Sequence, residues 1–138
     1  MLDFATGSGL VGIAAKKAGA AHVLASDIDP FCEAAVALNA RANGVELSFT
    51  PEDLLERPVP DVEVICAGDI CYAWPLADRV RRWLEAAHAA GQRVLIGDPG
   101  RAYLPREGLV ALATYEVPTT REIEDREVRR TGVFTLES

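Results

Sequence analysis

The sequence predicts an α/β protein built around a mostly parallel sheet, and two observations predict this class. Short apolar runs alternate with helical patterns as far as about residue 98, an order typical of parallel βαβ units. The alternation then stops, and Leu109–Val117 and Val128–Leu136 follow as two longer strand patterns with only a polar segment between them. We therefore expect a Rossmann-like, doubly wound, seven-stranded sheet that ends in an antiparallel C-terminal strand pair.

The first βαβ unit contains a candidate nucleotide site. An apolar strand runs into glycines at Gly7 and Gly9, and a helix is expected from about Leu10 to Ala18. The glycines let the backbone come close to a ligand, and the helix N-terminus offers unpaired N–H groups. The second strand, His22–Ser26, ends at Asp27, whose carboxylate can accept two hydrogen bonds from a ribose diol.

Asp3 distinguishes between two cofactor classes. It lies inside the first strand, before the glycines, whereas a dinucleotide fingerprint has its acidic residue only after the second strand. A carboxylate that faces the turn repels a pyrophosphate and suits a cationic amino-acid portion. This position favours S-adenosylmethionine over NAD. A tight turn without any ligand is the structural alternative.

Local signals predict the remaining elements. Asp29 can cap a helix that starts at Pro30 and ends at Asn43-Gly44. A further helix starts at Pro75 and ends at Gly91. Apolar residues recur at helical spacing in both helices, at Phe31, Ala34, Ala35, Leu38 and Ala42 in the first and, on the inner face, at Leu76, Val80, Trp83, Leu84 and Ala87 in the second. The other strands are expected at Val45–Thr50, Val62–Ala67 and Arg93–Ile96.

The third to fifth strands also end at polar residues, and ligands of open α/β sheets bind at that edge. Asp53 and Leu54 follow the third strand, where a carboxylate can meet an exocyclic amine and an apolar neighbour can cover a ring. Asp53 can also be a simple helix cap. Asp69 and Tyr72 follow the fourth strand. The loop after the fifth strand contains Asp98 and Arg101, and Asp98 can have a purely structural role in that turn.

Length and composition narrow the class of protein. The 138 residues, 49% hydrophobic and 25% charged, suit one domain, residues 1–138. A net charge of −7 disfavours nucleic acid and suits a basic protein partner. No apolar run is long enough for a membrane span, and no Cys or His spacing predicts a metal. Three cysteines without such spacing indicate free thiols and a cytoplasmic location.

The sequence begins inside its first predicted strand, which is central in a doubly wound sheet. We therefore expect a domain truncated at the N-terminus, without the segment that covers the ligand. Together these motifs resemble class I, seven-stranded S-adenosylmethionine methyltransferases, and more narrowly the electron-transfer-flavoprotein β-subunit lysine methyltransferases. The resemblance rests on Leu2-Asp3, Gly7-Ser8-Gly9, Ile13–Lys16, Ala25–Pro30, Leu38-Asn39, Asn43-Gly44, Gly68-Asp69, Tyr72, Leu76–Asp78 and Val94–Arg101.

The resemblance implies a role for each site residue. Asp3 and the backbone of Ala5, Gly7 and Gly9 are implied to hold the methionine part of S-adenosylmethionine. Asp27 is implied to hold the ribose hydroxyls, with Ile28 against the adenine, and Asp53 and Leu54 are implied to meet the adenine. Asp69 and Tyr72 are implied to line the entry of the target lysine. Ala5 replaces the family's first glycine. The implied activity is protein-lysine N-methylation of the flavoprotein β-subunit, in the cytoplasm of a bacterium or the mitochondrial matrix of a eukaryote.

The lysine amine must lose its proton before it attacks the methyl group, since a free lysine has a pKa of about 10.4. We expect Asp69 to recruit and orient the ammonium, and Tyr72 to wall the channel and hydrogen-bond the nitrogen. Three alternatives remain open: a methyltransferase acting on a ribosomal protein or small amine, a NAD(P)-binding Rossmann domain, and a non-catalytic binding module. The missing Asn-Pro-Pro-Tyr motif argues against amide or adenine N-methylation.

Overall fold

The structure is a computed structural model, and it describes residues 1–105, 107–119 and 128–138. In chain order its elements are β1 (Leu2–Phe4), α1 (Leu10–Lys17), β2 (Leu24–Ser26), α2 (Pro30–Ala42), β3 (Ser48–Thr50), the 3₁₀ turn η1 (Leu54–Glu56), β4 (Val64–Gly68), α3 (Leu76–Ala89), β5 (Arg93–Asp98), β6 (Leu109–Pro118) and β7 (Val128–Leu136). Part of the predicted polar segment, residues 120–127, lies outside the described residues.

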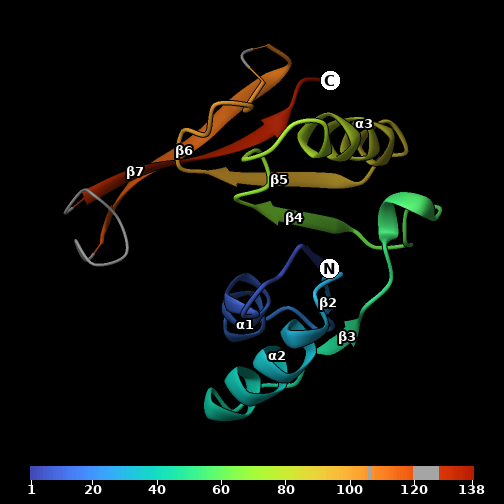
Figure 1. The fold of residues 1–138 in the computed structure, drawn as a ribbon, viewed down its shortest axis with the longest axis vertical. Helices are drawn as coiled ribbons and strands as arrows, with labels where there is room; N and C mark the ends of the chain where they lie inside the picture. The colour runs from blue at the N-terminus through green and yellow to red at the C-terminus, as the bar shows by residue number, and fades with distance from the viewer. Residues whose placement is uncertain (106, 120–127) are drawn as a thin grey trace.

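The strands form one seven-stranded sheet in the order β3-β2-β1-β4-β5-β7-β6 (Figure 1). The first five strands are parallel, and β7 is antiparallel to both β5 and β6. The long β6–β7 ribbon extends away from the rest of the sheet. The expected fold class, including the antiparallel C-terminal pair, is confirmed.

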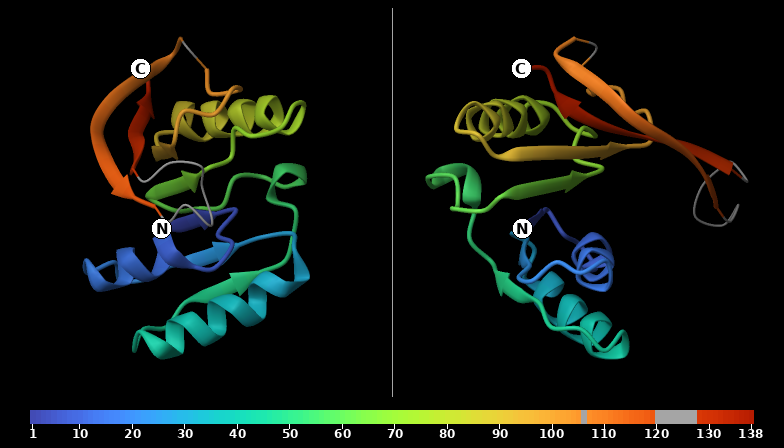
Figure 2. Two further views of the ribbon diagram at one scale, coloured as in Figure 1. Left: turned by 60° about the vertical axis from the view of Figure 1, so that its left-hand side comes forward. Right: turned by 180° about the vertical axis from the view of Figure 1, so that it is seen from behind.

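Helices cover both faces of the sheet (Figure 2). Successive side chains of a strand point to opposite faces, so Asp3 and Phe4 mark the two sides of β1. The Asp3 carboxylate accepts a hydrogen bond from the backbone N–H of Gly12 in α1. The Phe4 ring stacks on Trp83 of α3 with 5.1 Å between ring centroids. The α1 helix therefore covers one face, and α3 covers the other.

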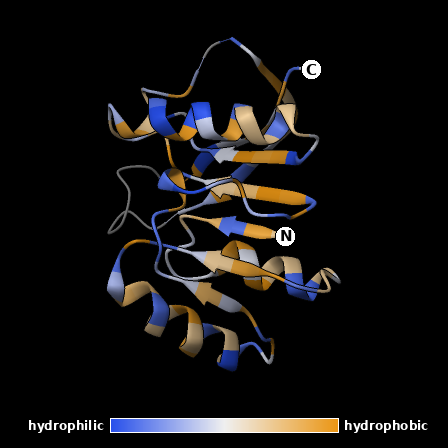
Figure 3. Ribbon diagram, turned by 90° about the vertical axis from the view of Figure 1, so that its right-hand side faces the viewer, coloured by the Kyte–Doolittle hydropathy of each residue, from blue (hydrophilic) through white to orange (hydrophobic). Residues whose placement is uncertain are grey.

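The core lies between α3 and the centre of the sheet, whose strands are the most apolar part of the molecule in Figure 3. Leu2, Ile65 and Val94 come from three adjacent strands and are all fully buried. They are packed with the inner face of α3, whose buried residues are Ala77, Val80, Trp83, Leu84 and Ala87. Four of these five are the residues predicted from helical spacing. Leu76, the fifth predicted position, is only partly buried.

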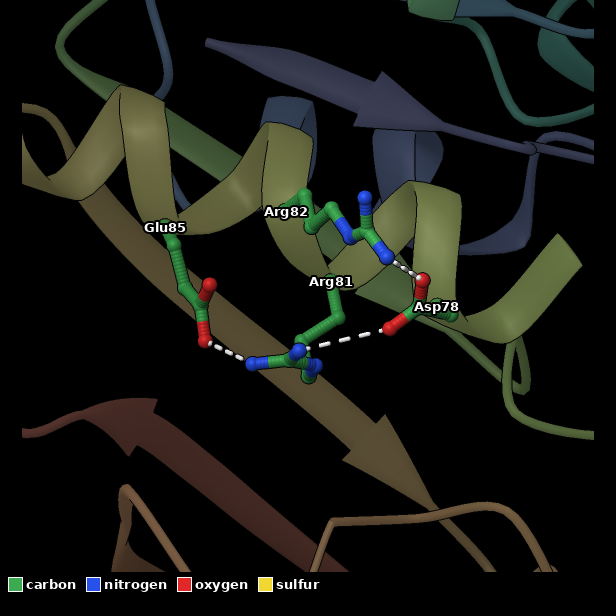
Figure 4. Close-up of polar contacts among 4 residues, drawn as sticks. All are labelled: Asp78, Arg81, Arg82 and Glu85. Atoms are coloured by element: carbon green, nitrogen blue, oxygen red, sulfur yellow. Dashed lines mark hydrogen bonds and ion pairs between the residues drawn. The ribbon is translucent and has the colours of Figure 1, made fainter. Parts of the chain in front are cut away.

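Ion pairs between successive turns stabilise α3 (Figure 4). Asp78 binds Arg82 with 2.6 Å between Oδ2 and Nη2, and Arg81 with 3.3 Å between Oδ1 and Nη2. Arg81 also reaches Glu85, four residues further on. Pairs at this spacing stabilise a helix by a few tenths of a kcal/mol each. No helix among the described residues is long and apolar enough to cross a membrane.

The structure differs from the sequence predictions at several strand ends and in one helix. β2 begins at Leu24 rather than His22, β3 begins at Ser48 rather than Val45, and β4 covers Val64–Gly68 rather than Val62–Ala67. In α2 the buried residues are Val36 and Ala40, while Phe31 and Leu38 are 81% and 68% exposed. The reason is close packing against α1, because the Val36 side chain fills the space beside Gly9. The fifth strand also continues beyond the predicted Ile96, since Gly97 and Asp98 pair with Val133 and Gly132 of β7.

Candidate cofactor and substrate site

The carboxyl ends of β1, β2 and β4 surround a cavity of about 230 Å³. It is lined by strand-end and loop residues from these strands, by η1 and by the start of α3. The structure thus brings together most of the predicted site residues, namely Ala5, Asp27, Ile28, Asp53, Leu54, Asp69 and Tyr72. Asp3, Gly7 and Gly9 are not part of this lining.

Asp3 lies beneath the glycine turn and does not face the cavity. Its side chain is 2% exposed, and its Oδ2 accepts hydrogen bonds from the Thr6 hydroxyl at 2.6 Å and from the Gly12 N–H at 2.7 Å. Burial raises the pKa of the Asp3 carboxyl, against the lowering effect of these two hydrogen bonds. Oδ2 of Asp3 is therefore used inside the fold. A contact of the Asp3 carboxylate with the methionine part of the cofactor stays a prediction.

The glycine turn has a left-handed backbone at three positions, which lets the chain come close to a ligand. Gly7 and Gly9 have φ angles of 56° and 85°, in the left-handed region that glycine adopts freely. Ala5 also has a positive φ, 53°, which is costly for a residue with a Cβ. The Ala5 that replaces the first glycine of the resembled family thus keeps a glycine-like backbone.

Asp27 joins the ends of β1 and β2. Its Oδ2 accepts a hydrogen bond from the Gly7 N–H at 2.9 Å, and its Oδ1 accepts one from the Asp29 N–H at 3.0 Å. An ionised carboxylate has about four acceptor positions, so each oxygen keeps one for a second donor. The side chain lines the cavity and is partly exposed. Asp27 is therefore fixed in place and still able to bind a vicinal diol.

Two neighbours of Asp27 complete this wall. The Ser26 hydroxyl is buried at the cavity and has no hydrogen-bond partner among the described residues. Ile28 is 67% exposed and presents an apolar surface at the cavity's rim. A buried hydroxyl without a partner among the described residues, a carboxylate with open acceptor positions and an exposed apolar surface match the donor and acceptor pattern of a nucleoside. The residues present therefore fit the adenosine part of the predicted cofactor.

Asp53 takes the capping position that the sequence left open. Its Oδ1 accepts a hydrogen bond from the Leu55 N–H at 3.0 Å at the start of η1. Its Oδ2 lies 3.9 Å from Nη2 of Arg79, which also pairs with Glu56. Leu54 is 7% exposed and forms an apolar part of the cavity wall. A contact of Asp53 and Leu54 with adenine stays a prediction.

Asp69 is held by an arginine from the next strand's loop. Arg101 donates from Nε to Oδ1 at 2.6 Å and from Nη2 to Oδ2 at 2.7 Å, a two-point pair. This pair lowers the pKa of the Asp69 carboxyl below its usual range. The backbone at Asp69 has a φ of 53°, and its N–H donates to the Gly97 carbonyl at 2.8 Å. Asp69 is consequently a fixed carboxylate at the cavity's edge.

Asp98 fixes the loop that contains Arg101. It is 1% exposed, and its Oδ1 accepts hydrogen bonds from the N–H groups of Gly100 and Arg101, both at 2.7 Å. The structural role that the sequence kept open for Asp98 is confirmed. Beside this loop Trp74 and Tyr103 lie with 6.4 Å between ring centroids, and both are exposed.

Sequence reasoning missed three parts of the site. It did not pair Arg101 with Asp69, it did not use Ser26, and it gave no role to Arg79. The pairing joins residues 32 positions apart, so only the alignment of β4 with β5 shows it. Ser26 could have been found from its position directly before Asp27. Among the described residues no group of His, Cys, Asp and Glu is suited to a metal ion.

A second, wider hollow of about 840 Å³ lies at the opposite edge of the sheet, between α1, α2 and β3. Lys16, His22 and Arg41 contribute to its lining, and none of the strand-end carboxylates does. The carboxylates at the carboxyl ends of the strands therefore line the smaller cavity and not this hollow.

The chain is similar in sequence to known methyltransferases. Residues 1–92 match the family of ribosomal protein L11 methyltransferase (PrmA). The electron transfer flavoprotein beta subunit lysine methyltransferase of Rattus norvegicus is 34% identical over 140 residues, which are 97% of this chain and 55% of that protein. The ribosomal protein L11 methyltransferase of Caldicellulosiruptor bescii is 45% identical over 68 residues, 49% of this chain and 22% of that protein. The chain spans about half the length of the flavoprotein methyltransferases it matches.

A solved structure with this fold is magnesium protoporphyrin IX methyltransferase from Synechocystis PCC 6803 with bound S-adenosylmethionine. Its TM-score is 0.66 at 21% identity, over 99% of this chain and 69% of that one. The strand order and this likeness define a class I S-adenosylmethionine-dependent methyltransferase fold. Within that class, the chain belongs to the PrmA family of methyltransferases, as the match over residues 1–92 shows.

Proposed function

We propose that this chain is the S-adenosylmethionine-binding part of a protein-lysine N-methyltransferase that acts on the electron transfer flavoprotein β-subunit. The observation that supports this most is the juxtaposition of a nucleoside-fitting wall and a fixed carboxylate, Asp69, in one cavity. The relatives at 34% identity over nearly the whole chain are named for that substrate.

The cofactor part of the proposal assigns a role to each wall of the cavity. Asp27 accepts the two ribose hydroxyls, Ser26 gains a hydrogen-bond partner, and Ile28 lies against the adenine. The backbone of Ala5, Gly7 and Gly9 receives the methionine portion at the start of α1. Asp3 acts from beneath, since its bonds to Thr6 and Gly12 hold the turn in the shape that this contact needs.

The substrate part concerns the entry beside Asp69 and Tyr72, both in the cavity's lining. Each Asp69 oxygen has one bond from Arg101 and keeps an acceptor position for an amine. Tyr72 is 60% exposed and can wall the channel of an aliphatic side chain. When bound, S-adenosylmethionine supplies an activated methyl group: the lysine nitrogen forms a new N–C bond while the C–S bond breaks and its electron pair stays on sulfur.

The test is methyl transfer from S-adenosylmethionine to purified flavoprotein β-subunit, followed by intact mass and peptide mapping. With the parent enzyme, we expect the flavoprotein β-subunit to gain the mass of one or more methyl groups, located on lysine. Asp69→Ala should keep cofactor binding and lose most of the transfer. No transfer to this substrate by a chain that binds the cofactor would refute the substrate assignment, and unchanged turnover of Asp69→Ala would refute the role of Asp69.

A second candidate is methylation of ribosomal protein L11, which the family match over residues 1–92 favours. Isolated L11 assayed beside the flavoprotein subunit separates the two. We also propose a reducing compartment, such as the cytoplasm of a bacterium. The thiols of Cys32, Cys66 and Cys71 support this, because all three are free.

A further inference from the structure

The two-point pair between Arg101 and Asp69 raises a chemical problem for lysine methylation. An ammonium beside an ionised carboxylate is stabilised in its charged form, so its pKa rises. Methyl transfer requires the neutral amine, and a free lysine is already almost wholly protonated at neutral pH. A bare carboxylate at this position would bind the substrate and at the same time hinder its deprotonation.

The geometry of Arg101 answers this problem. Its guanidinium meets both oxygens of Asp69 at 2.6 and 2.7 Å, and its backbone N–H is anchored on the buried Asp98 at 2.7 Å. The cation is thus held at the carboxylate by its loop as well as by its charge. Asp69 is itself held on the other side by the hydrogen bond from its N–H to the Gly97 carbonyl.

We propose that Arg101 is a positioning residue that keeps Asp69 in a neutral ion pair, so that the carboxylate orients the incoming lysine amine without retaining its proton. The inference rests on the proposed lysine methylation. The proton leaves the ammonium for solvent water before attack, and Asp69 remains ionised throughout. The carboxylate supplies the direction of one hydrogen bond, and the guanidinium offsets its charge.

The other charged and titratable groups around Asp69 act in the same direction or are silent near neutral pH. Arg129 of β7 adds to the lowering of the pKa of Asp69. Burial, with the charges of Asp98 and Asp69, raises the pKa of Cys71 to about 11, so this thiol stays protonated. On the same loop Tyr72 contributes only a phenol. Arg101 is therefore the group whose removal changes the charge at Asp69 most.

The first test is the pH dependence of methyl transfer by Arg101→Gln, Arg101→Lys and the parent, with the flavoprotein β-subunit as substrate. We expect the acidic limb of kcat, which reports the lysine bound beside Asp69, to move up by about one pH unit for Arg101→Gln, since a close opposite charge shifts a pKa by at least that much. Its KM should fall about threefold, because the bare carboxylate attracts the ammonium more strongly. Arg101→Lys should restore most of the parent profile, and Arg41→Gln, at the far end of α2, should leave it unchanged.

The second test does not depend on activity. The Asp69 carboxyl carbon is titrated by NMR in the parent and in Arg101→Gln, and its pKa should be higher in the variant. An unmoved carboxyl pKa, or an unmoved acidic limb in a variant that still transfers methyl groups, would overturn the inference. Loss of transfer in the parent itself would instead refute the proposed function, so the two failures are distinguishable.

Discussion

The two halves of the cavity are built differently. In the cofactor half, which we define as β1, β2 and β3 with the loops after them, Asp3 and Asp27 accept backbone N–H groups from the glycine turn, from α1 and from the start of α2. In the substrate half, defined as β4 and β5 with the loops after them, an exposed ion pair between Asp69 and Arg101 joins the two loops.

This difference matches what each half has to do. A cofactor that is the same in every turnover suits a site fixed by buried hydrogen bonds, which are costly to break. A protein substrate must enter and leave, and an exposed ion pair directs the Asp69 carboxylate while it contributes little to the stability of the fold. We therefore expect substitutions in the cofactor half to lower the free energy of unfolding more than matched substitutions in the substrate half.

The largest expected effect comes from removing the buried carboxylate of the cofactor half. Asp3→Ala leaves the Thr6 hydroxyl and the Gly12 N–H without their acceptor inside the protein, and should lower the free energy of unfolding by about 3 kcal/mol. Asp98→Ala is the matched change in the substrate half. It should cost only about 1 kcal/mol, because Gly100 is exposed and water can replace the lost acceptor. Urea unfolding measures both, and equal losses would contradict the comparison.

A methyl group added at a glycine tests packing in the same way. A Cβ at Gly12 would lie 3.0 Å from Oδ2 of Asp3 and 3.1 Å from Cγ1 of Val23, so Gly12→Ala should destabilise by about 2 kcal/mol despite its better helix propensity. Gly68 at the end of β4 has nothing within 4 Å of its added Cβ. Gly68→Ala should therefore change stability by less than about 0.5 kcal/mol. Thermal unfolding of the two variants side by side checks the contrast, which a large loss in Gly68→Ala would break.

The strained turn offers a stabilising change. Ala5 has a φ of 53°, a conformation that costs about 1–2 kcal/mol for a residue with a Cβ. Replacing Ala5 by glycine removes this strain. Glycine also has more conformational freedom in the unfolded chain, which offsets part of the gain, so Ala5→Gly should stabilise the fold by about 0.5 kcal/mol. Ala5→Val should destabilise at the same site. Chemical unfolding of both variants is the measurement, and a less stable Ala5→Gly would show that the turn is relaxed.

The smallest effect is a dependence of stability on pH in the substrate half. The pKa of Asp69 is lowered in the folded state, chiefly by its hydrogen bonds from Arg101. Its stabilising contribution is therefore complete above the ordinary value of 3.8 and is lost as the pH falls through the lower folded value. Because the pair is partly exposed, we expect a difference of only about 0.5 kcal/mol between the parent and Asp69→Asn at pH 6. The difference should vanish toward pH 2, and a constant difference would contradict the ion pair as its origin.

The sequence predicted the fold well because its signals are local and agree with one another. Asp29 caps α2 as predicted, and Pro30 starts it. The β6 and β7 patterns are recognisable because no helical spacing separates them. The weaker predictions concern the direction in which side chains point. The order of residues placed Asp3 inside the first strand, before the glycines, but which groups its carboxylate meets depends on how α1 packs, since Gly12 of α1 donates to it.

The substrate half was harder to predict, and for a physical reason. Asp69 and Arg101 meet only because β4 and β5 are adjacent and in register, with Gly68 opposite Gly97. Neither residue's neighbours in sequence indicate the pairing. The same holds for α2, where Phe31 and Leu38 have helical spacing but face outward, because the contact with Gly9 turns Val36 inward. Contacts between distant residues determine these details, and periodicity alone does not report them.

The most direct test of the account is calorimetric titration of the chain with S-adenosylhomocysteine. We predict binding that Asp27→Ala weakens by about 100-fold, since two hydrogen bonds to a charged group are lost. The affinity of Asp27→Asn should lie between those of the parent and Asp27→Ala, because one acceptor oxygen remains. Asp69→Asn and Arg101→Gln, in the substrate half, should bind as the parent does. Binding that survives Asp27→Ala, or that depends on Asp69 as strongly as on Asp27, would contradict the division of the cavity into two halves.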